Sequence, residues 1–212
     1  NTGLSSEDAG AISLTMLNSV TRDSEINIKS DYPTVEKKVK DGNGNAVDIA
    51  DYDIGDEIEF TLNSAVPGMD GYSEYTFNFH DELSSGLTYK SNSVKVKIGN
   101  VEYDANSVYK DGTKVFTVNQ DGQKLTVKLA DLIDLKNNLN SDGDTNNNID
   151  TDTSIVVTYT ATLNKNAITG KDGNTNKVYI EYSNSPYKSD EKGKTPEDKV
   201  IVYTYQLDVS KT

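Results

Sequence analysis

The sequence contains no cysteine, no tryptophan and only one histidine, His80. Without cysteine the chain forms no disulfide, so it fits a cytosolic protein, or a secreted one held together by another staple or by a large core. A single histidine leaves a nucleophilic triad or a histidine-based zinc site without its further partners. The sequence therefore argues against a hydrolase or a zinc enzyme, and strand alternation predicts that His80 points to the surface.

Basic residues and long apolar runs are also scarce. The sequence has 21 Lys and Arg residues and 34 Asp and Glu residues, which gives a formal charge of −13 and a pI near 4.5. Nucleic acids and anionic lipids attract basic patches, so neither is expected as a partner. No apolar run approaches the length of a transmembrane helix, and the residues after Asn1 do not resemble a signal peptide. We therefore expect a mature or excised piece without membrane insertion.

Short alternating runs separated by turn residues dominate from Thr34 onward, which is the pattern of a β-sandwich or barrel. One short helix is expected at Ala130–Leu139, with Asp131 near its start. The 212 residues suit one large all-β domain, or one domain plus a fragment of another. The expected strands are Thr34–Lys40, Glu57–Leu62, Tyr75–Phe79, Val94–Ile98, Val115–Val118, Leu125–Leu129, Ile155–Leu163, Lys177–Ser183 and Val200–Val209.

The Asn/Asp-rich tract 137–152 is expected to be a surface loop that could offer oxygens to Ca²⁺. An EF-hand loop needs a glycine at its sixth position and a glutamate at its twelfth, and counting from Asp142 gives Asn147 and Thr153. A solvated acidic loop is favoured over a metal site. No metal and no cofactor is predicted.

The stretch Tyr32–Lys40 places a lysine in an apolar row. On an extended strand Val35, Lys37 and Val39 share one face, while Lys38 points the other way. A buried ammonium group is costly unless it is paired, deprotonated or chemically consumed. The ordinary alternative is a lysine at a sheet edge that bends its head back to water.

Two distant segments place an acid and an amide in similar rows. Asp81 ends the aromatic row that starts at Tyr75, which predicts a raised pKa for its carboxyl. Asn184 continues the apolar row that starts at Val178. Asn176 has the same parity but is expected in the turn before that strand, so it ranks second. The ordinary role of such side chains is to satisfy loop backbone groups.

An inward lysine, aspartic acid and asparagine together match the chemistry of an autocatalytic isopeptide bond. Apolar surroundings keep the lysine neutral and nucleophilic, and a protonated carboxylic acid polarises the amide carbonyl. The amine then attacks, ammonia leaves, and two strands become covalently joined.

Residues 32–205 resemble the isopeptide-forming middle domain, of the D2 or CnaA type, of Gram-positive sortase-assembled backbone pilins. The resemblance rests on several motifs in the family's order over some 170 residues. They are YPTVEKKV from Tyr32, IGDEI from Ile54, FHDELSSGL from Phe79, VTYTATL from Val157, NTNKVYIEYSN from Asn174 and TPEDKVIVYTY from Thr195.

The resemblance implies an all-β, immunoglobulin-like sandwich of the CnaA type. It implies a bond between Lys37 and Asn184, with Asp81 as the catalytic acid. Lys38 is the rival nucleophile by proximity, but its parity places it outward. It also implies that residues 1–31 are the tail of a preceding domain or a linker, and that 32–206 form the pilin domain. Residues 207–212 would then start a following domain, whose bond-forming lysine is Lys211.

The expected function is that of a structural shaft segment of a cell-wall-anchored extracellular pilus, without enzymatic turnover. The expected partners are other pilin subunits, joined by sortase in the full-length protein. The chain holds neither the Leu-Pro-x-Thr-Gly sorting signal nor a tyrosine-proline-lysine pilin motif. The alternative is an adhesin domain that binds a host glycan or matrix protein on the same scaffold.

Overall fold

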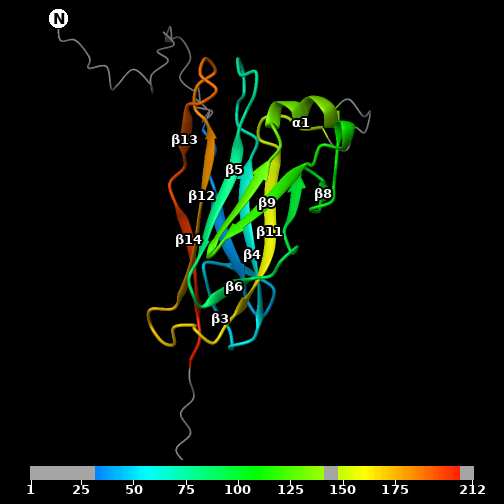
Figure 1. The fold of residues 1–212 in the computed structure, drawn as a ribbon. Coiled ribbons are helices and arrows are strands. Elements are labelled where there is room, and N and C mark those ends of the chain that lie inside the picture. Colours follow the sequence, from blue (N-terminus) through cyan, green and yellow to red (C-terminus); the bar gives the residue numbers. More distant parts are fainter. Residues whose placement is uncertain (1–31, 141–147, 206–212) are drawn as a thin grey trace, which may run out of the picture.

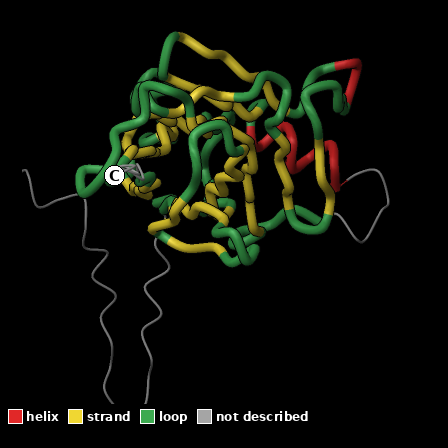
Figure 2. The backbone as a smooth tube through the Cα atoms, turned by 90° about the horizontal axis from the view of Figure 1, so that it is seen from below, coloured by secondary structure: helices red, strands yellow, loops and turns green. Residues whose placement is uncertain are grey.

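The computed structural model describes residues 32–140 and 148–205 as two seven-stranded sheets packed face to face (Figure 1). The segments expected at 1–31 and 207–212, including Lys211, lie outside the described residues. The expected immunoglobulin-like β-sandwich is confirmed. Figure 2 shows the strands in two layers, with the helical segments to one side.

The first sheet has the strand order β2-β1-β4-β11-β7-β8, and β6 pairs with β11 beside this path. Its strands are β1 (Glu36–Lys40), β2 (Ala46–Val47), β4 (Glu57–Ala65), β6 (Leu87–Tyr89), β7 (Lys95–Ile98), β8 (Val101–Tyr103) and β11 (Ser154–Leu163).

The second sheet has the order β3-β14-β12-β5-β10-β9, with β13 paired to β12. All described pairs are antiparallel except that of β14 with β3. Its strands are β3 (Ile49–Asp51), β5 (Phe77–Leu83), β9 (Phe116–Asp121), β10 (Lys124–Leu129), β12 (Asn174–Ser183), β13 (Lys192–Lys194) and β14 (Asp198–Tyr203).

The long strands follow the alternation that the sequence predicts. In β11 every second residue is buried, from Ile155 to Leu163, and the residues between them are half-buried. The same period sets the inward row of β12, which begins at Asn174 and includes Asn176. The two inner faces meet in one core, so each inward row is removed from water.

The expected helix is present as α1 (Leu132–Leu139), and Asp131 is its N-cap. A carboxylate oxygen of Asp131 accepts a hydrogen bond from the backbone N–H of Asp134, at 2.9 Å. Its other oxygen accepts one from the N–H of Tyr75, at 2.6 Å. One side chain thus caps the helix and ties it to the segment just before β5. A short 3₁₀ turn, η1 (Lys110–Gly112), precedes β9.

Several strands differ from the expectation. β2, β3, β6, β8 and β13 have two or three residues each, too few for alternation to reveal them. β5 continues past the expected end to Leu83. The strand expected at Val200–Val209 is β14, which starts at Asp198 and ends at Tyr203.

The described chain enters and leaves the sandwich at opposite ends (Figure 1). Tyr32 packs against Tyr182 near the end of β12, with ring centroids 6.0 Å apart. At the other end, Val202 of β14 pairs with Asn174, the first residue of β12. β12 therefore runs from the exit end of the domain to its entry end.

Candidate functional site

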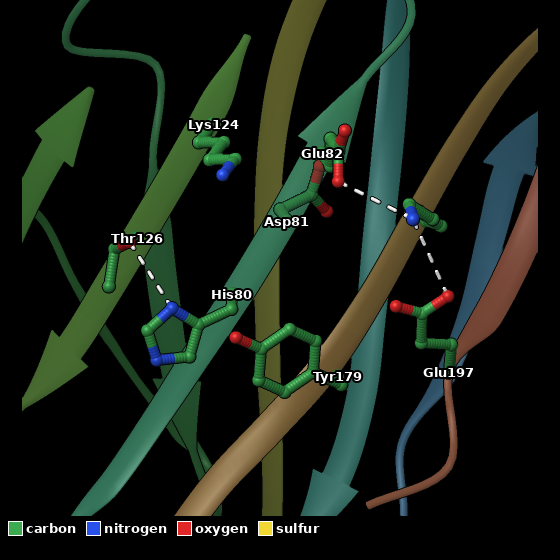
Figure 3. Close-up of a pocket in the computed structure, with 8 residues that line it drawn as sticks. His80, Asp81, Glu82, Lys124, Thr126, Tyr179 and Glu197 are labelled. Atoms are coloured by element: carbon green, nitrogen blue, oxygen red, sulfur yellow. Dashed lines mark hydrogen bonds and ion pairs between the residues drawn. The ribbon is translucent and has the colours of Figure 1, made fainter. Parts of the chain in front are cut away.

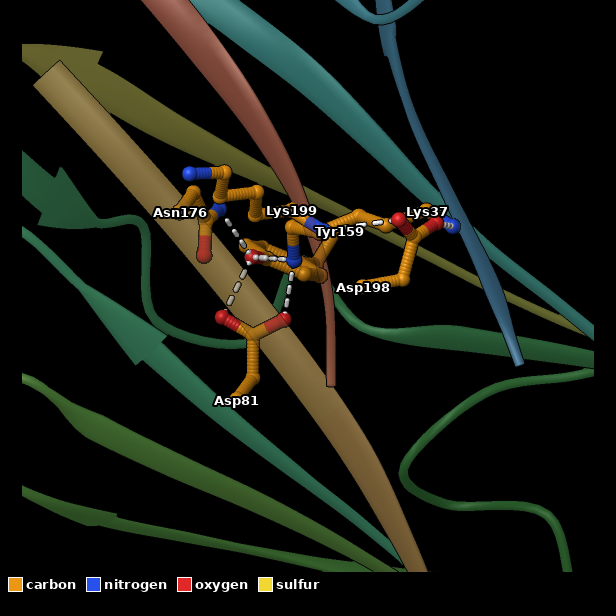
Figure 4. Close-up of polar contacts among 6 residues, drawn as sticks. All are labelled: Lys37, Asp81, Tyr159, Asn176, Asp198 and Lys199. Carbon is orange, nitrogen blue, oxygen red and sulfur yellow. Dashed lines mark hydrogen bonds and ion pairs between the residues drawn. The ribbon is translucent and has the colours of Figure 1, made fainter. Parts of the chain in front are cut away.

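A buried polar cluster lies between the two sheets (Figure 4). The first sheet contributes Lys37 from β1 and Tyr159 from β11, and the second contributes Asp81 from β5 and Asn176 from β12. All four side chains are in the core, and Lys37 and Asn176 are 0% exposed. Each belongs to an inward row of its strand, so the fold collects polar groups from four strands at one point.

The hydroxyl of Tyr159 is the centre of this cluster. It donates a hydrogen bond to Oδ1 of Asp81, at 2.9 Å. It accepts one from Nζ of Lys37 at 3.2 Å and one from Nδ2 of Asn176 at 2.6 Å. Nζ of Lys37 also bonds directly to Oδ2 of Asp81. The amine, the acid and the amide are therefore all neighbours.

Burial sets the protonation of the pair. Desolvation lowers the pKa of Lys37, and the opposing attraction of Asp81 is the smaller effect. Desolvation likewise raises the pKa of Asp81 against the attraction of Lys37. Both shifts favour a neutral amine beside a protonated carboxylic acid. This confirms the direction that the sequence predicts for Asp81.

Lys37 is held in place from its backbone as well. Its N–H donates a hydrogen bond to Oδ2 of Asp198 on β14, at 2.6 Å. Its Nζ lies 5.4 Å from the ring centroid of Phe60 and 5.3 Å from that of Tyr159. The lysine head is thus enclosed by aromatic rings and does not bend back to water.

The structure brings Asn176, and not Asn184, to Lys37 and Asp81. β12 begins at Asn174, so Asn176 lies inside the strand and not in a preceding turn. β12 ends at Ser183, and Asn184 is exposed, with its backbone N–H bonded to the carbonyl of Glu191 at 3.0 Å. The expectation that Asn184 continues the inward row is wrong, because the strand ends one residue before it.

Two residues that contact Lys37 are not predicted as site residues from the sequence: Tyr159 of the cluster, and Asp198 beside it. Tyr159 is recognisable only as a core tyrosine, although a hydroxyl in an inward apolar row requires a buried partner. Nothing in the sequence around Asp198 indicates a site residue. It is the first residue of β14, and it contacts Lys37 only because β14 packs beside β1.

Lys38 points away from the cluster, as expected. Its Nζ forms ion pairs with Asp48 at 2.7 Å and with Glu36 at 3.0 Å.

The outer face of β5 and β12 carries a shallow, charged pocket (Figure 3). The ring of His80 stacks on that of Tyr179, with centroids 4.9 Å apart. Lys177 forms ion pairs with Glu82 at 3.4 Å and Glu197 at 3.6 Å. His80 thus lies on the outer side, as predicted, among partly exposed ion pairs that resemble an ordinary solvated sheet face.

Within residues 32–140 and 148–205, no group of three or more His, Cys, Asp or Glu side chains is arranged to hold a metal ion. Asp150 of the acidic loop pairs with Lys136 at 2.9 Å, while residues 141–147 of that loop lie outside the described ranges. No helix of the described part is long and apolar enough to cross a membrane.

The fold and the cluster together define the class of this protein. It is an immunoglobulin-like β-sandwich with a lysine–aspartate pair buried between its two sheets. No protein-family model matches the chain. Over 201 residues the chain is 30% identical to the trypsin-resistant surface T6 protein of Streptococcus pyogenes serotype M6. The match covers 84% of this chain and 33% of that protein, so the chain spans about a third of the length of this curated relative.

Solved structures of backbone pilins share the fold. The T6 backbone pilin of serotype M6 Streptococcus pyogenes matches with a TM-score of 0.56 and 24% identity, over 81% of this chain and 36% of that one. BcpA, the major pilin subunit of Bacillus cereus, matches with a TM-score of 0.57 and 20% identity, over 81% and 40%. Sequence and fold together confirm the resemblance: the chain is a relative of the Gram-positive backbone pilins.

Proposed function

We propose that this chain is a load-bearing shaft segment of a cell-surface pilus, stabilised by an autocatalytic isopeptide bond between Lys37 and Asn176. The observation that carries the proposal is the fully buried cluster that joins Lys37 of one sheet to Asp81 and Asn176 of the other. The relatives are named as pilus backbone subunits, and we infer the same extracellular location and the same assembly with other pilin subunits here.

The bond forms in a single turnover. Nζ of neutral Lys37 attacks Cγ of Asn176, the new Nζ–Cγ bond replaces the Cγ–Nδ2 bond, and ammonia leaves. Protonated Asp81 stabilises the negative charge that develops on the amide oxygen. That oxygen, Oδ1 of Asn176, is buried without a hydrogen-bond partner among the described residues. Such groups are rare in folded proteins, and a reactive role accounts for this one.

The unusual pKa values make the reaction feasible at neutral pH. With the reference values of 10.5 for lysine and 3.8 for aspartic acid, a neutral amine beside a protonated acid would be only about one state in 10⁷ at pH 7. The ion pair and the neutral pair hold the same number of protons. Burial disfavours the ion pair, and therefore increases the fraction of molecules that hold the neutral, reactive pair at any given pH between the two pKa values.

The position of the bond suits a shaft. The described chain enters the domain near the end of β12 and leaves near its start, so tension along a pilus would act across the whole sandwich. A Lys37–Asn176 bond closes a loop of 139 residues (176 − 37). By the loop-entropy model for disulfides, this stabilises the fold by about 5 kcal/mol. The bond would supply the staple that the cysteine-free sequence lacks.

Intact mass spectrometry of the folded chain tests the proposal. The bond removes one ammonia, about 17 Da, from the sequence mass. The Asn176→Ala variant is expected to keep the full sequence mass, while Asn184→Ala, a matched control at the exposed asparagine, still shows the loss. An unmodified mass for the folded native chain would refute the bond. A loss of about 18 Da, one water, would instead indicate an amide between Lys37 and Asp81.

A further inference from the structure

Tyr159 contacts both nitrogens that exchange places in the proposed reaction. Its hydroxyl oxygen lies 3.2 Å from Nζ of Lys37, the attacking atom, and 2.6 Å from Nδ2 of Asn176, the leaving atom. The side chain is 1% exposed, so water does not reach the hydroxyl freely. No other side chain of the described residues forms hydrogen bonds with both nitrogens.

The chemistry requires one proton to move between these nitrogens. A neutral amine carries two hydrogens and the amide that it becomes carries one, so Nζ loses one proton. The amide nitrogen carries two hydrogens and leaves as ammonia with three, so Nδ2 gains one. The overall reaction neither takes up nor releases a proton, and a group that bridges the two nitrogens is sufficient for the transfer.

We propose that Tyr159 is a catalytic residue that relays this proton from Lys37 to the leaving nitrogen of Asn176. The inference rests on the isopeptide bond proposed above. In the tetrahedral intermediate Nδ2 becomes an amine with a free lone pair. The Tyr159 hydroxyl then gives its proton to Nδ2 and takes one from Nζ, so it ends the step as it began.

The environment of Tyr159 keeps the hydroxyl protonated until that step. Burial, the largest cause, holds the pKa of Tyr159 well above its usual range. The hydrogen bond to Oδ1 of Asp81, at 2.9 Å, also fixes the position of the hydroxyl oxygen, and the O–H turns from Asp81 to Nδ2 during the transfer. The ring is fixed by stacking on Phe60, with centroids 5.5 Å apart, so the oxygen is held between the two nitrogens.

The test is the rate at which the newly made chain loses ammonia. The 212-residue chain is synthesised in a cell-free system, samples are quenched in denaturant at intervals, and the fraction with the lower mass is measured. Tyr159→Phe keeps the ring and removes the oxygen, and loss of acid–base catalysis is expected to slow the reaction about 100-fold or more. Tyr89→Phe is the matched control, because that ring lies 6.1 Å from Tyr159 outside the cluster.

The outcomes separate the two proposals. No mass loss in the native chain overturns the isopeptide bond itself. Mass loss at equal rates in the native chain and in a folded Tyr159→Phe variant overturns the relay alone.

If circular dichroism shows that Tyr159→Phe does not fold, the native chain is compared in H₂O and D₂O. The relay moves two protons, so the rate of ammonia loss is expected to be lower in D₂O. A plot of this rate against the deuterium fraction of the solvent is expected to be curved and not linear, because more than one proton moves. An equal rate in the two solvents overturns the relay.

Discussion

Lys37 and Lys38 are neighbours on β1, and they have opposite environments. The Lys37 side chain is fully buried against Asp81, whereas that of Lys38 is 23% exposed and pairs with Asp48 and Glu36 on the surface. Burial lowers the pKa of Lys37, while hydrogen bonds to Asp48 and Glu36 raise that of Lys38. One position along a strand thus separates a buried amine with a lowered pKa from a partly exposed amine with a raised pKa.

The same contrast occurs on β5 between His80 and Asp81. Asp81 faces the core, and burial raises its pKa. His80 faces outward, with Nε2 3.8 Å from a carboxylate oxygen of Glu181. Partial burial lowers the pKa of His80, so at neutral pH it adds little charge to the outer face. The inner residue of each pair belongs to the buried cluster, and the outer residue offers a matched control for a substitution of its neighbour.

The largest expected effect is that of Asp81→Ala compared with His80→Ala. Loss of Asp81 removes the acid, so no bond forms, and the fold loses about 5 kcal/mol of loop-closure stabilisation. The buried Lys37 amine also loses its carboxyl hydrogen-bond partner, which adds about 1 to 3 kcal/mol. Guanidinium unfolding followed by circular dichroism measures the difference. An Asp81→Ala protein that unfolds at the midpoint of His80→Ala would contradict the account.

The next effect is mechanical. Pulled at both ends in a single-molecule experiment, the bonded domain can release residues 32–36 and the 29 residues 177–205 (205 − 176), but not the loop between Lys37 and Asn176. That limits the released length to on the order of 100 Å at full extension. Lys37→Met is expected to release the whole domain, on the order of 600 Å. Lys38→Met should behave like the native chain, and a long extension in both variants would oppose the proposed bond.

The smallest effect is the pH dependence of bond formation, followed by mass in the cell-free reaction. The rate should fall at high pH, as Asp81 ionises through its raised pKa. It should also fall at low pH, as Lys37 is protonated through its lowered pKa. Between these limits the rate should be level, because the ion pair and the neutral pair hold equal numbers of protons. A rate that rises steadily up to pH 10 would indicate an ordinary exposed lysine.

Alternation along strands predicts most of the fold and part of the site. It places Lys37 and Asp81 inward correctly, because each lies within a strand whose apolar row is plain. Alternation does not show which of Asn176 and Asn184 is buried, because both have the same parity. That depends on where β12 begins and ends, at Asn174 and Ser183. The turn before β12 is at Gly173, where φ is +61° and an added Cβ would lie 2.5 Å from Ile201. That crowding comes from β14 and is invisible in the local sequence.

The partners of Lys37 depend on packing between strands that are distant in sequence. Tyr159 reaches Lys37 because β11 and β1 both flank β4. Asp198 reaches it because β14 lies beside β1. Neither contact has a signature in the spacing of residues, so only the assembled sandwich reveals them.

The most direct test of the central claim is to locate the bond by proteolysis and tandem mass spectrometry of the native chain. The account predicts one branched peptide that joins the segment around Lys37 to the segment around Asn176, lighter than its two parts by one ammonia. Recovery of both segments as separate linear peptides of full mass, or a branch at Asn184, would contradict it.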